Sequence, residues 1–563
     1  MKVVDIIKII LFSQLILTSI GVNAIEQKAA KPINKYSTLT EKQIENSLRA
    51  HVAFLADDLL KGRDTGSHGY EIAAHYVANQ FAQYGLVPAG DNNTWFQSVP
   101  LLKSTLDKFS VQMVLHDKFS KHATKFNYPE QFVMLASADH TKEKVTAKII
   151  FVGYGIVSKK LKHNDYAGLE VAGKIVLILA GRPVAYQSEQ GAYLTMIDEK
   201  IRHAAEYGAV GVIIMDTPMT EKQHFYQHIA KFTNAPRLQW QQKEEADFGS
   251  YSTIHAISIV TTKTAKTIFT SAGLSVNKIF NDIEQGKLPA GFDLNIEMSL
   301  THKTAQKHIT SPNVIGLIEG SDPTLKKEYI VYSAHLDHLG VNHSNGNDVI
   351  NNGALDNATG VAIMLETARH FSLTEKPKRS ILFIAVTGEE KNLLGSDYFA
   401  HYPSVPLNAI VANINIDMPI LLYPFADIIA FGAQHSSINS VVESAAMVNG
   451  LTVSPDPVPE LTLFVRTDHF SFVKQGIPSI YLMPGFTSTD PTINGGQIAQ
   501  QFYRKHYHHP SDDIRLPIDY HAGVMFTKVN FTIGRDIANN NIRPHWNKHD
   551  FFGDTFTPTL NDK

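Results

Sequence analysis

The sequence contains no cysteine among its 563 residues. A disulfide framework, a thiolate metal site and a cysteine nucleophile are therefore excluded. An excess of one charge is also lacking, because 51 Lys and Arg residues face 54 Asp and Glu residues, for a net charge of −3. This near-balance excludes the strongly basic surface typical of nucleic-acid binding. The sequence has neither internal repeats nor low-complexity tracts, and beyond the N-terminus no apolar run approaches the length of a membrane span.

What the sequence does contain is typical of a folded globular protein. Hydrophobic residues make up 44% and charged residues 19%, which is enough apolar side chain for a large core. The length predicts two or three domains, or one large domain with an insertion. Because cysteine is absent, any metal ion must be bound by His, Asp and Glu, and the 26 histidines make such a site plausible.

The N-terminus has the pattern of a secretory signal peptide. Lys2 and Lys8 precede an apolar run over residues 9–20, and small residues lead up to Ala24. A membrane anchor is the alternative, but the run is shorter than the ~20 apolar residues that a spanning helix needs. We expect cleavage after Ala24, so that residues 1–24 are removed and the mature protein is periplasmic or secreted and free of the membrane.

Residues 126–295 are β-rich and differ from the segments on either side. Apolar runs and one helical pattern occur at residues 147–155, 173–179, 211–215 and 197–207. The stretch contains no concentrated group of His, Asp and Glu, so we interpret it as a separate, non-catalytic module inserted into a host domain.

The segments around this insertion predict an α/β domain. Helical patterns cover residues 41–60 and 69–81 before it. After it, four buried strands are predicted at residues 329–334, 381–386, 409–416 and 477–483. Helices are predicted at residues 360–371, 437–449 and 520–539. This alternation predicts a mostly parallel central sheet flanked by helices.

Metal-type side chains follow these strands at their carboxyl ends, where open α/β sheets bind their ligands. His335 ends the first strand, the pair Glu389-Glu390 follows the second, and Asp417 follows the third. Asp356 lies just ahead of a helix, and a further group occupies residues 507–513. Taken alone, each of these motifs is more often structural than metal-binding. Taken together, the carboxylates of these motifs would lie close to one another at the strand ends, and their negative charges would repel unless cations neutralised them.

Two histidines and three carboxylates suit two divalent ions, zinc first. A pair of such ions needs one bridging carboxylate and one free carboxylate that takes a proton from the attacking water. The side chains of the neighbours Glu389 and Glu390 diverge, so one can bind metal while the other faces the water.

The motifs resemble those of the co-catalytic zinc aminopeptidases of peptidase family M28. The resemblance rests on SAHLDHLG (333–340), ALDNATG (354–360), TGEE (387–390), NIDM (415–418), YHHPSD (507–512) and FLADDLLKGR (54–63). The β-rich insertion resembles the protease-associated (PA) domain, on the motifs NDYAG (164–168) and GKIVL (173–177). The resemblance implies a catalytic domain made of residues 25–125 and 296–563, with a PA-like domain at 126–295.

The resemblance also implies roles for individual residues. Asp356 would bridge two zinc ions, with His335 and Asp417 completing one site and Glu390 and His508 the other. Glu389 would be the general base for a water bound by both zinc ions. Tyr507 would stabilise the tetrahedral intermediate, and Asp337 would fix the tautomer of His335. The implied activity is that of a secreted aminopeptidase acting on peptides.

Other residues near the motifs have no ligand role in the family pattern. These are His338, His343, His506 and His509. The segment RTDHF, residues 466–470, resembles a family loop near the substrate pocket, and a structural role for it is equally open.

Several alternatives remain open on the sequence. A carboxypeptidase or dipeptidase could use the same scaffold, with Arg466 as the cation that binds a substrate carboxylate. A receptor-like binding protein is disfavoured because all five ligands and the base are present, and a di-metal phosphoesterase because no phosphate-binding glycine loop occurs. The sequence fixes neither the preferred residue at the cleaved bond nor the oligomeric state.

Overall fold

The structure, a computed structural model, describes residues 39–116, 123–186, 188–233, 235–242, 251–343 and 346–557. The predicted signal peptide, residues 1–24, lies outside these residues, so its removal stays a prediction. No helix in the described part of the chain is both long and apolar enough to cross a membrane.

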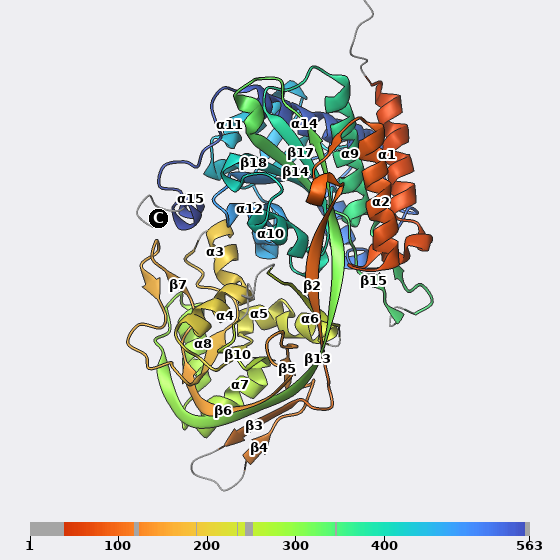
Figure 1. Cartoon of the computed structure of the whole chain (residues 1–563). Coiled ribbons are helices and arrows are strands. Elements are labelled where there is room, and N and C mark those ends of the chain that lie inside the picture. Colours follow the sequence, from red (N-terminus) through yellow and green to blue (C-terminus); the bar gives the residue numbers. More distant parts are fainter. Residues whose placement is uncertain are drawn as a thin grey trace, which may run out of the picture. The chain divides into compact units, whose positions relative to one another are not determined.

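One sheet carries the expected α/β architecture (Figure 1). Its strands lie in the order β11-β2-β13-β17-β14-β18-β21-β19-β20, and β17, β14, β18 and β21 run parallel. The strands are β2 (Phe96–Leu106), β11 (Arg237–Trp240), β13 (Phe292–Ile318), β14 (Tyr329–His335), β17 (Ser380–Val386), β18 (Ile410–Ile416), β19 (Asp427–Phe431), β20 (Thr452–Ser454) and β21 (Ser479–Pro484). The prediction of a mostly parallel central sheet is confirmed.

Helices cover both faces of this sheet, as the continuous apolar runs of its strands require. On one face lie α1 (Glu41–Leu55), α2 (His68–Gln83), α9 (Thr359–Leu373) and α14 (Tyr520–Asn539). On the other lie α10 (Leu394–His401) and α12 (His469–Val473). Successive residues of β14 serve the two faces: the Tyr332 hydroxyl donates to the carbonyl of Asn530 in α14, whereas Val331 packs in a cluster with Phe472 of α12.

A second sheet belongs to the β-rich insertion. Its order is β4-β3-β13-β6-β9-β10-β12-β5, with β6, β9, β10 and β12 parallel. Its further strands are β3 (Gln112–His116), β4 (Ala123–Lys125), β5 (Phe132–Met134), β6 (Lys142–Phe151), β9 (Ile175–Leu179), β10 (Gly211–Met215) and β12 (Ala256–Val260). The helices of this part are α3 (Ser188–Thr195), α4 (Ile197–Glu206), α5 (Pro218–Lys222), α6 (Phe225–Phe232), α7 (Thr262–Ser271) and α8 (Val276–Glu284).

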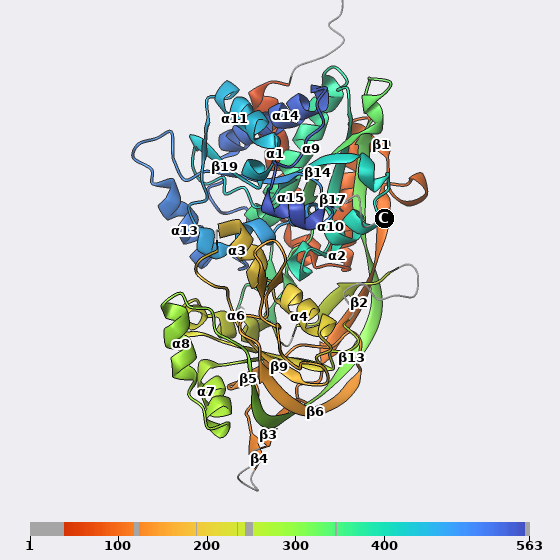
Figure 2. The same ribbon diagram turned by 90° about the vertical axis from the view of Figure 1, so that its left-hand side faces the viewer.

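The long strand β13 takes part in both sheets (Figure 1, Figure 2). Its first part pairs with β3 and β6, and its last part with β17. Between them it forms an antiparallel ribbon with β2. The predicted domain boundary at residue 296 therefore falls within a continuous strand, and the domain limits stay a prediction.

The remaining elements are short or lie near the chain end. They are β1 (Val87–Pro88), β7 (Val157–Ser158), β8 (His163–Asn164), β15 (Gly340–Val341), β16 (Ile350–Asn351), α11 (Ile438–Val448), α13 (Gly495–Lys505) and α15 (Phe551–Phe556). Single helical turns include η1 (Asp58–Arg63), η5 (Ala354–Ala358), η6 (Glu389–Lys391) and η8 (Ala433–His435).

Candidate metal centre

Neighbouring parallel strands deliver the predicted ligands to one edge of the sheet. His335 is the last residue of β14, Glu390 lies in η6 just after β17, and Asp417 directly follows β18. Because these strands run parallel, their carboxyl ends meet at that edge. Asp356 comes from η5, ahead of α9, and His508 from the loop after α13.

Three of these side chains form a first buried group. The Nε2 atom of His335 lies 3.2 Å from Oδ1 of Asp356 and 3.0 Å from Oδ1 of Asp417. His335 Nδ1 donates to the backbone carbonyl of Asp337 over 3.1 Å. This bond leaves the lone pair of Nε2 facing the two carboxylates, which is the orientation of a metal-binding histidine.

A second group shares Asp356 with the first. His508 Nε2 lies 3.4 Å from Oδ2 of Asp356 and 3.0 Å from Oε2 of Glu390. Asp356 thus presents one carboxylate oxygen to each group, as a carboxylate that bridges two ions does. All five residues predicted as ligands come together in this way.

His338 also belongs to the second group, although sequence reasoning gave it no ligand role. Its Nδ1 atom lies 2.6 Å from Oε1 of Glu390 and 3.9 Å from Oδ2 of Asp356, and the ring is fully buried. The ring fits because Gly353, at φ 62°, has no side chain: a Cβ there would lie 2.7 Å from it. The sequence did contain one signal for a ligand role of His338. It lies only three residues after His335, in the loop that follows the same strand.

The other nearby histidines lie outside both groups. His506 and His509 each place Nδ1 close to the Ser511 hydroxyl, at 2.9 and 3.1 Å. Among the described residues, neither they nor His343 join a cluster that could hold a metal.

Glu389 lies beside the two groups without joining either. Burial raises its pKa well above the usual value, and the charges of Asp417 and Glu390 act in the same direction. Its backbone N–H donates to Oδ1 of Asp337 over 3.1 Å. A partly buried carboxylate with a raised pKa, beside two groups of metal-type side chains, is suited to accept a proton from water.

Asp337 acts differently from the expectation. Its carboxylate does not contact His335; Oδ2 instead accepts a hydrogen bond of 2.9 Å from the hydroxyl of Thr65, and Oδ1 accepts from Glu389. The tautomer of His335 is set by the backbone carbonyl of Asp337 because the chain turns directly after β14. Asp337 therefore orients the segment that carries Glu389.

The charges of the centre fit a pair of cations. Burial raises the pKa of Asp417, and neighbouring carboxylates add to the rise. Burial likewise raises the pKa of Asp468 to about 7. Burial opposes the charged form of His508, but Glu390 and Asp356 outweigh it and raise its pKa to about 10. Such a concentration of buried carboxylates is costly without cations, and two histidines with carboxylate oxygens are zinc ligands.

Tyr507 and Arg466 lie together at the second group. Arg466 Nη2 donates to the Tyr507 hydroxyl over 3.1 Å, and the Tyr507 ring stacks on His508 at a centroid distance of 3.8 Å. Burial raises the pKa of Tyr507 well above its usual value, so the phenol keeps its proton and can donate a hydrogen bond. The contact with Arg466 was not predicted.

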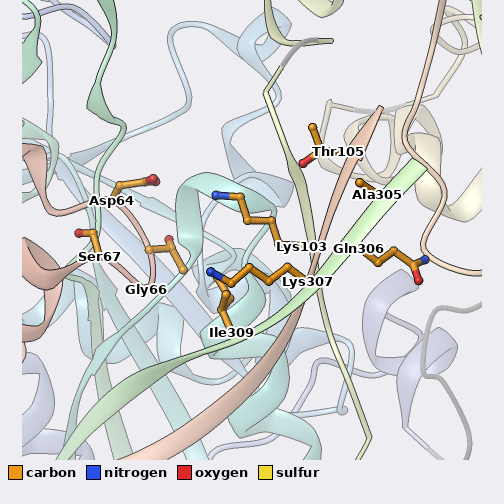
Figure 3. A pocket seen from close by; sticks show the side chains of 10 residues that line it. Asp64, Gly66, Ser67, Lys103, Thr105, Ala305, Gln306, Lys307 and Ile309 are labelled. Atoms are coloured by element: carbon orange, nitrogen blue, oxygen red, sulfur yellow. The ribbon is translucent and has the colours of Figure 1, made fainter. Parts of the chain in front are cut away.

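A cavity of about 360 Å³ reaches the centre on the side of Thr65 (Figure 3). Thr65 lines it and also binds Asp337 of the centre. Lys103 of β2 and Lys307 of β13 are paired across the ribbon, and both extend toward the side of the cavity that holds Asp64. The ribbon of β2 and β13 thus contributes two positive charges to the cavity.

Comparison with known proteins identifies the two parts of the chain. Residues 313–532 match peptidase family M28, and residues 141–264 match the PA domain. A probable zinc metalloprotease of Pyrenophora tritici-repentis (strain Pt-1C-BFP) is 33% identical over 141 residues, which cover 24% of this chain and 31% of the relative. Aminopeptidase YwaD of Bacillus subtilis (strain 168) is 29% identical over 244 residues, covering 43% of this chain and 48% of the relative.

The matched segments span less than a third of the first curated relatives. Among solved structures, the aminopeptidase from Aneurinibacillus sp. strain AM-1 has the same fold, with a TM-score of 0.50 at 19% identity over 89% of this chain and 97% of that one. Both profiles match and the metal-type residues lie on the M28 segment, so residues 313–532 form a domain of peptidase family M28, with a PA domain inserted ahead of it.

Proposed function

We propose that the protein is an exported, zinc-dependent aminopeptidase that removes N-terminal residues from peptides. The observation that carries this proposal is Asp356, whose two carboxylate oxygens face two separate His-carboxylate groups with Glu389 beside them. His335 and Asp417 would hold one zinc ion, Glu390 and His508 the other, and Asp356 both. When bound, the ions supply Lewis acidity that lowers the pKa of water and polarises the scissile carbonyl.

Side chains of the protein transfer the protons and stabilise the oxyanion. Glu389 takes the proton from the attacking water and passes it to the leaving amine. The Tyr507 hydroxyl, oriented by Arg466, donates to the oxyanion of the tetrahedral intermediate. The carboxylates of the centre provide the negative field that attracts a protonated N-terminal amine.

A carboxypeptidase or dipeptidase is the second candidate, because cations also lie near the centre. Arg466 contacts Tyr507, and Lys103 and Lys307 line the neighbouring cavity. A substrate carboxylate could pair with any of them.

Hydrolysis of a panel of aminoacyl-nitroanilides, beside N-blocked copies of the same substrates, tests the proposal. The protein is assayed as purified, after chelation and after zinc is restored. We expect cleavage of the unblocked substrates alone, lost with the chelator and regained with zinc. Cleavage of neither set, with at least two ions bound per chain, would refute the aminopeptidase and favour the second candidate.

Export rests on the sequence pattern of residues 1–24. N-terminal sequencing of the mature protein from fractionated cells checks it. We expect a first residue of Ile25 and recovery outside the cytoplasm, whereas a cytoplasmic protein that retains Met1 would overturn this part of the proposal.

A further inference from the structure

The PA-type part of the chain contains a third cluster of metal-type side chains. His140 precedes β6, Glu143 lies on β6, and His255 directly precedes β12. One ligand atom from each lies within 4.8 Å of the others. The sequence predicted no such group in residues 126–295, because His255 is far along the chain from His140 and Glu143 and only the fold brings it to them.

The separations within this cluster suit metal ligands better than hydrogen bonds. Nδ1 of His140 lies 3.3 Å from Oε1 of Glu143, and Nδ1 of His255 lies 3.6 Å from Oε2 of Glu143. A tetrahedral zinc ion with bonds of about 2.0–2.1 Å places neighbouring ligand atoms roughly 3.3–3.4 Å apart. The longer contact, at 3.6 Å, exceeds a hydrogen bond but is close to this ligand spacing.

The outer contacts orient the imidazoles as they do in metal sites. His140 Nε2 donates to the backbone carbonyl of Ser252 over 3.1 Å, so its Nδ1 carries the lone pair. His255 Nδ1 is buried and has no hydrogen-bond partner among the described residues. His302, a fully buried residue of β13, donates from Nε2 to the backbone carbonyl of His255 over 2.9 Å and so holds the start of β12. A buried nitrogen without a partner is costly unless a ligand binds it.

We propose that His140, Glu143 and His255 bind a divalent transition-metal ion such as Zn²⁺, separately from the ligand set of the catalytic centre. Two imidazoles and one carboxylate favour zinc or a similar borderline ion over Ca²⁺ and Mg²⁺, which prefer oxygen ligands. Each side chain is partly exposed, at 18%, 28% and 33%, so water can reach the ion and complete its coordination. The ion joins the start of β6 to the start of β12 and thereby stabilises this end of the sheet.

Metal content after chelation, zinc loading and dialysis tests the proposal. We expect the His140→Ala/His255→Ala variant to bind one zinc ion per chain fewer than the unmodified protein, with unchanged peptidase activity. The near-isosteric Glu143→Gln variant should bind the third ion at least 10-fold more weakly. His308→Ala, which removes an exposed histidine of β13, is the matched control and should keep the full metal content.

Anomalous diffraction from zinc-loaded crystals of the unmodified protein locates the ion without any variant. A peak between His140, Glu143 and His255 is expected. Equal metal content in the double variant and the unmodified protein, or no peak at this position, would overturn the proposal. Because the readouts are metal content and position, an inactive enzyme would refute the proposed function while leaving this test intact.

Discussion

Glu389 and Glu390 are neighbours in the chain, yet the structure gives them opposite electrostatic environments. Burial raises the pKa of Glu389 well above its usual value. Burial acts on Glu390 in the same sense, but His508 and His338 outweigh it and hold its pKa well below the usual value. One residue is thus suited to gain a proton while the other stays ionised as a ligand.

The first prediction concerns this pair. Glu389→Gln should lower kcat by about 10²–10⁴-fold, because the amide cannot accept the proton of the attacking water. Metal content should stay unchanged, since Glu389 is outside both ligand groups. Steady-state kinetics beside elemental analysis checks this, with the exposed Glu443→Gln as control. Full activity in Glu389→Gln would contradict the assignment.

The second prediction concerns His338. Because its Nδ1 atom lies 2.6 Å from Glu390, His338→Ala should free that carboxylate and weaken the binding of one of the two zinc ions proposed for the catalytic centre by about 10–100-fold, with the binding of the other unaffected. Competition with a chromophoric chelator measures both affinities. His506→Ala, at a histidine that contacts Ser511 instead, is the matched control. If both zinc affinities of the centre were unchanged in His338→Ala, the contact between His338 and Glu390 would not contribute to zinc binding.

How much of the site could be predicted differs from residue to residue. The convergence of His335, Glu390 and Asp417 could be predicted, since each follows or ends a strand of the parallel set and parallel strands end at one edge. The place of His338 depends on the path of the loop after His335 and on the room at Gly353, neither of which a motif encodes.

At the scale of elements, one ionic cluster joins three segments that are distant in sequence. His435 of η8 contacts Glu189 of α3, and its Nδ1 lies 2.5 Å from Oδ2 of Asp550, the residue that caps α15. Burial disfavours the charged imidazole, but the two carboxylates outweigh it and raise the pKa of His435 to about 9. The cluster therefore holds α3 and α15 against the α/β domain while His435 is protonated.

The third prediction follows from that raised pKa. Since His435 has a pKa of about 9 in the folded state and about 6.5 when unfolded, its contribution is complete below pH 6.5 and is lost as pH rises through 9. We expect the free energy of unfolding to fall by about 1–3 kcal/mol over this range. Urea unfolding at a series of pH values measures it. His435→Gln should lack this loss, His308→Gln should retain it, and an equal loss in His435→Gln would contradict the assignment.

The predictions of elements were most accurate where strands and helices are mostly buried. The helix at residues 520–539 is α14, and the four predicted strands are β14, β17, β18 and β21. The strand β13 was not predicted, because residues 305–308 in its middle are exposed and polar and resemble a linker. Pairing with β2, which makes them a strand, is a long-range contact that local pattern does not reveal.

At the scale of the whole molecule, we expect metal binding and folding to be coupled. The buried carboxylates of the centre repel one another in the folded chain and are separated in the unfolded chain. The cations should therefore contribute to the stability of the entire domain.

The fourth prediction is that chelation lowers the melting temperature and that zinc restores it in a concentration-dependent way. One ion at 100 times its Kd adds about 2.7 kcal/mol to the free energy of unfolding. Differential scanning calorimetry over a zinc series measures the effect. Asp356→Asn changes the residue shared by both groups and should weaken zinc binding at each. The melting temperature of this variant should therefore rise much less with zinc than that of the unmodified protein. A melting temperature independent of zinc would refute the coupling.

The strand β13 also has a consequence for the order in which the chain can fold during synthesis. The segments α1, α2 and β2 are made before the PA domain, but the part of β13 that pairs with β2, and the helices α9 and α14, are made only after it. Until then β2 has an unpaired edge, and the apolar faces of α1 and α2 are uncovered. Because exposed edges and apolar faces attract other chains, the nascent protein should depend on chaperones from the synthesis of β2 until α14 is complete.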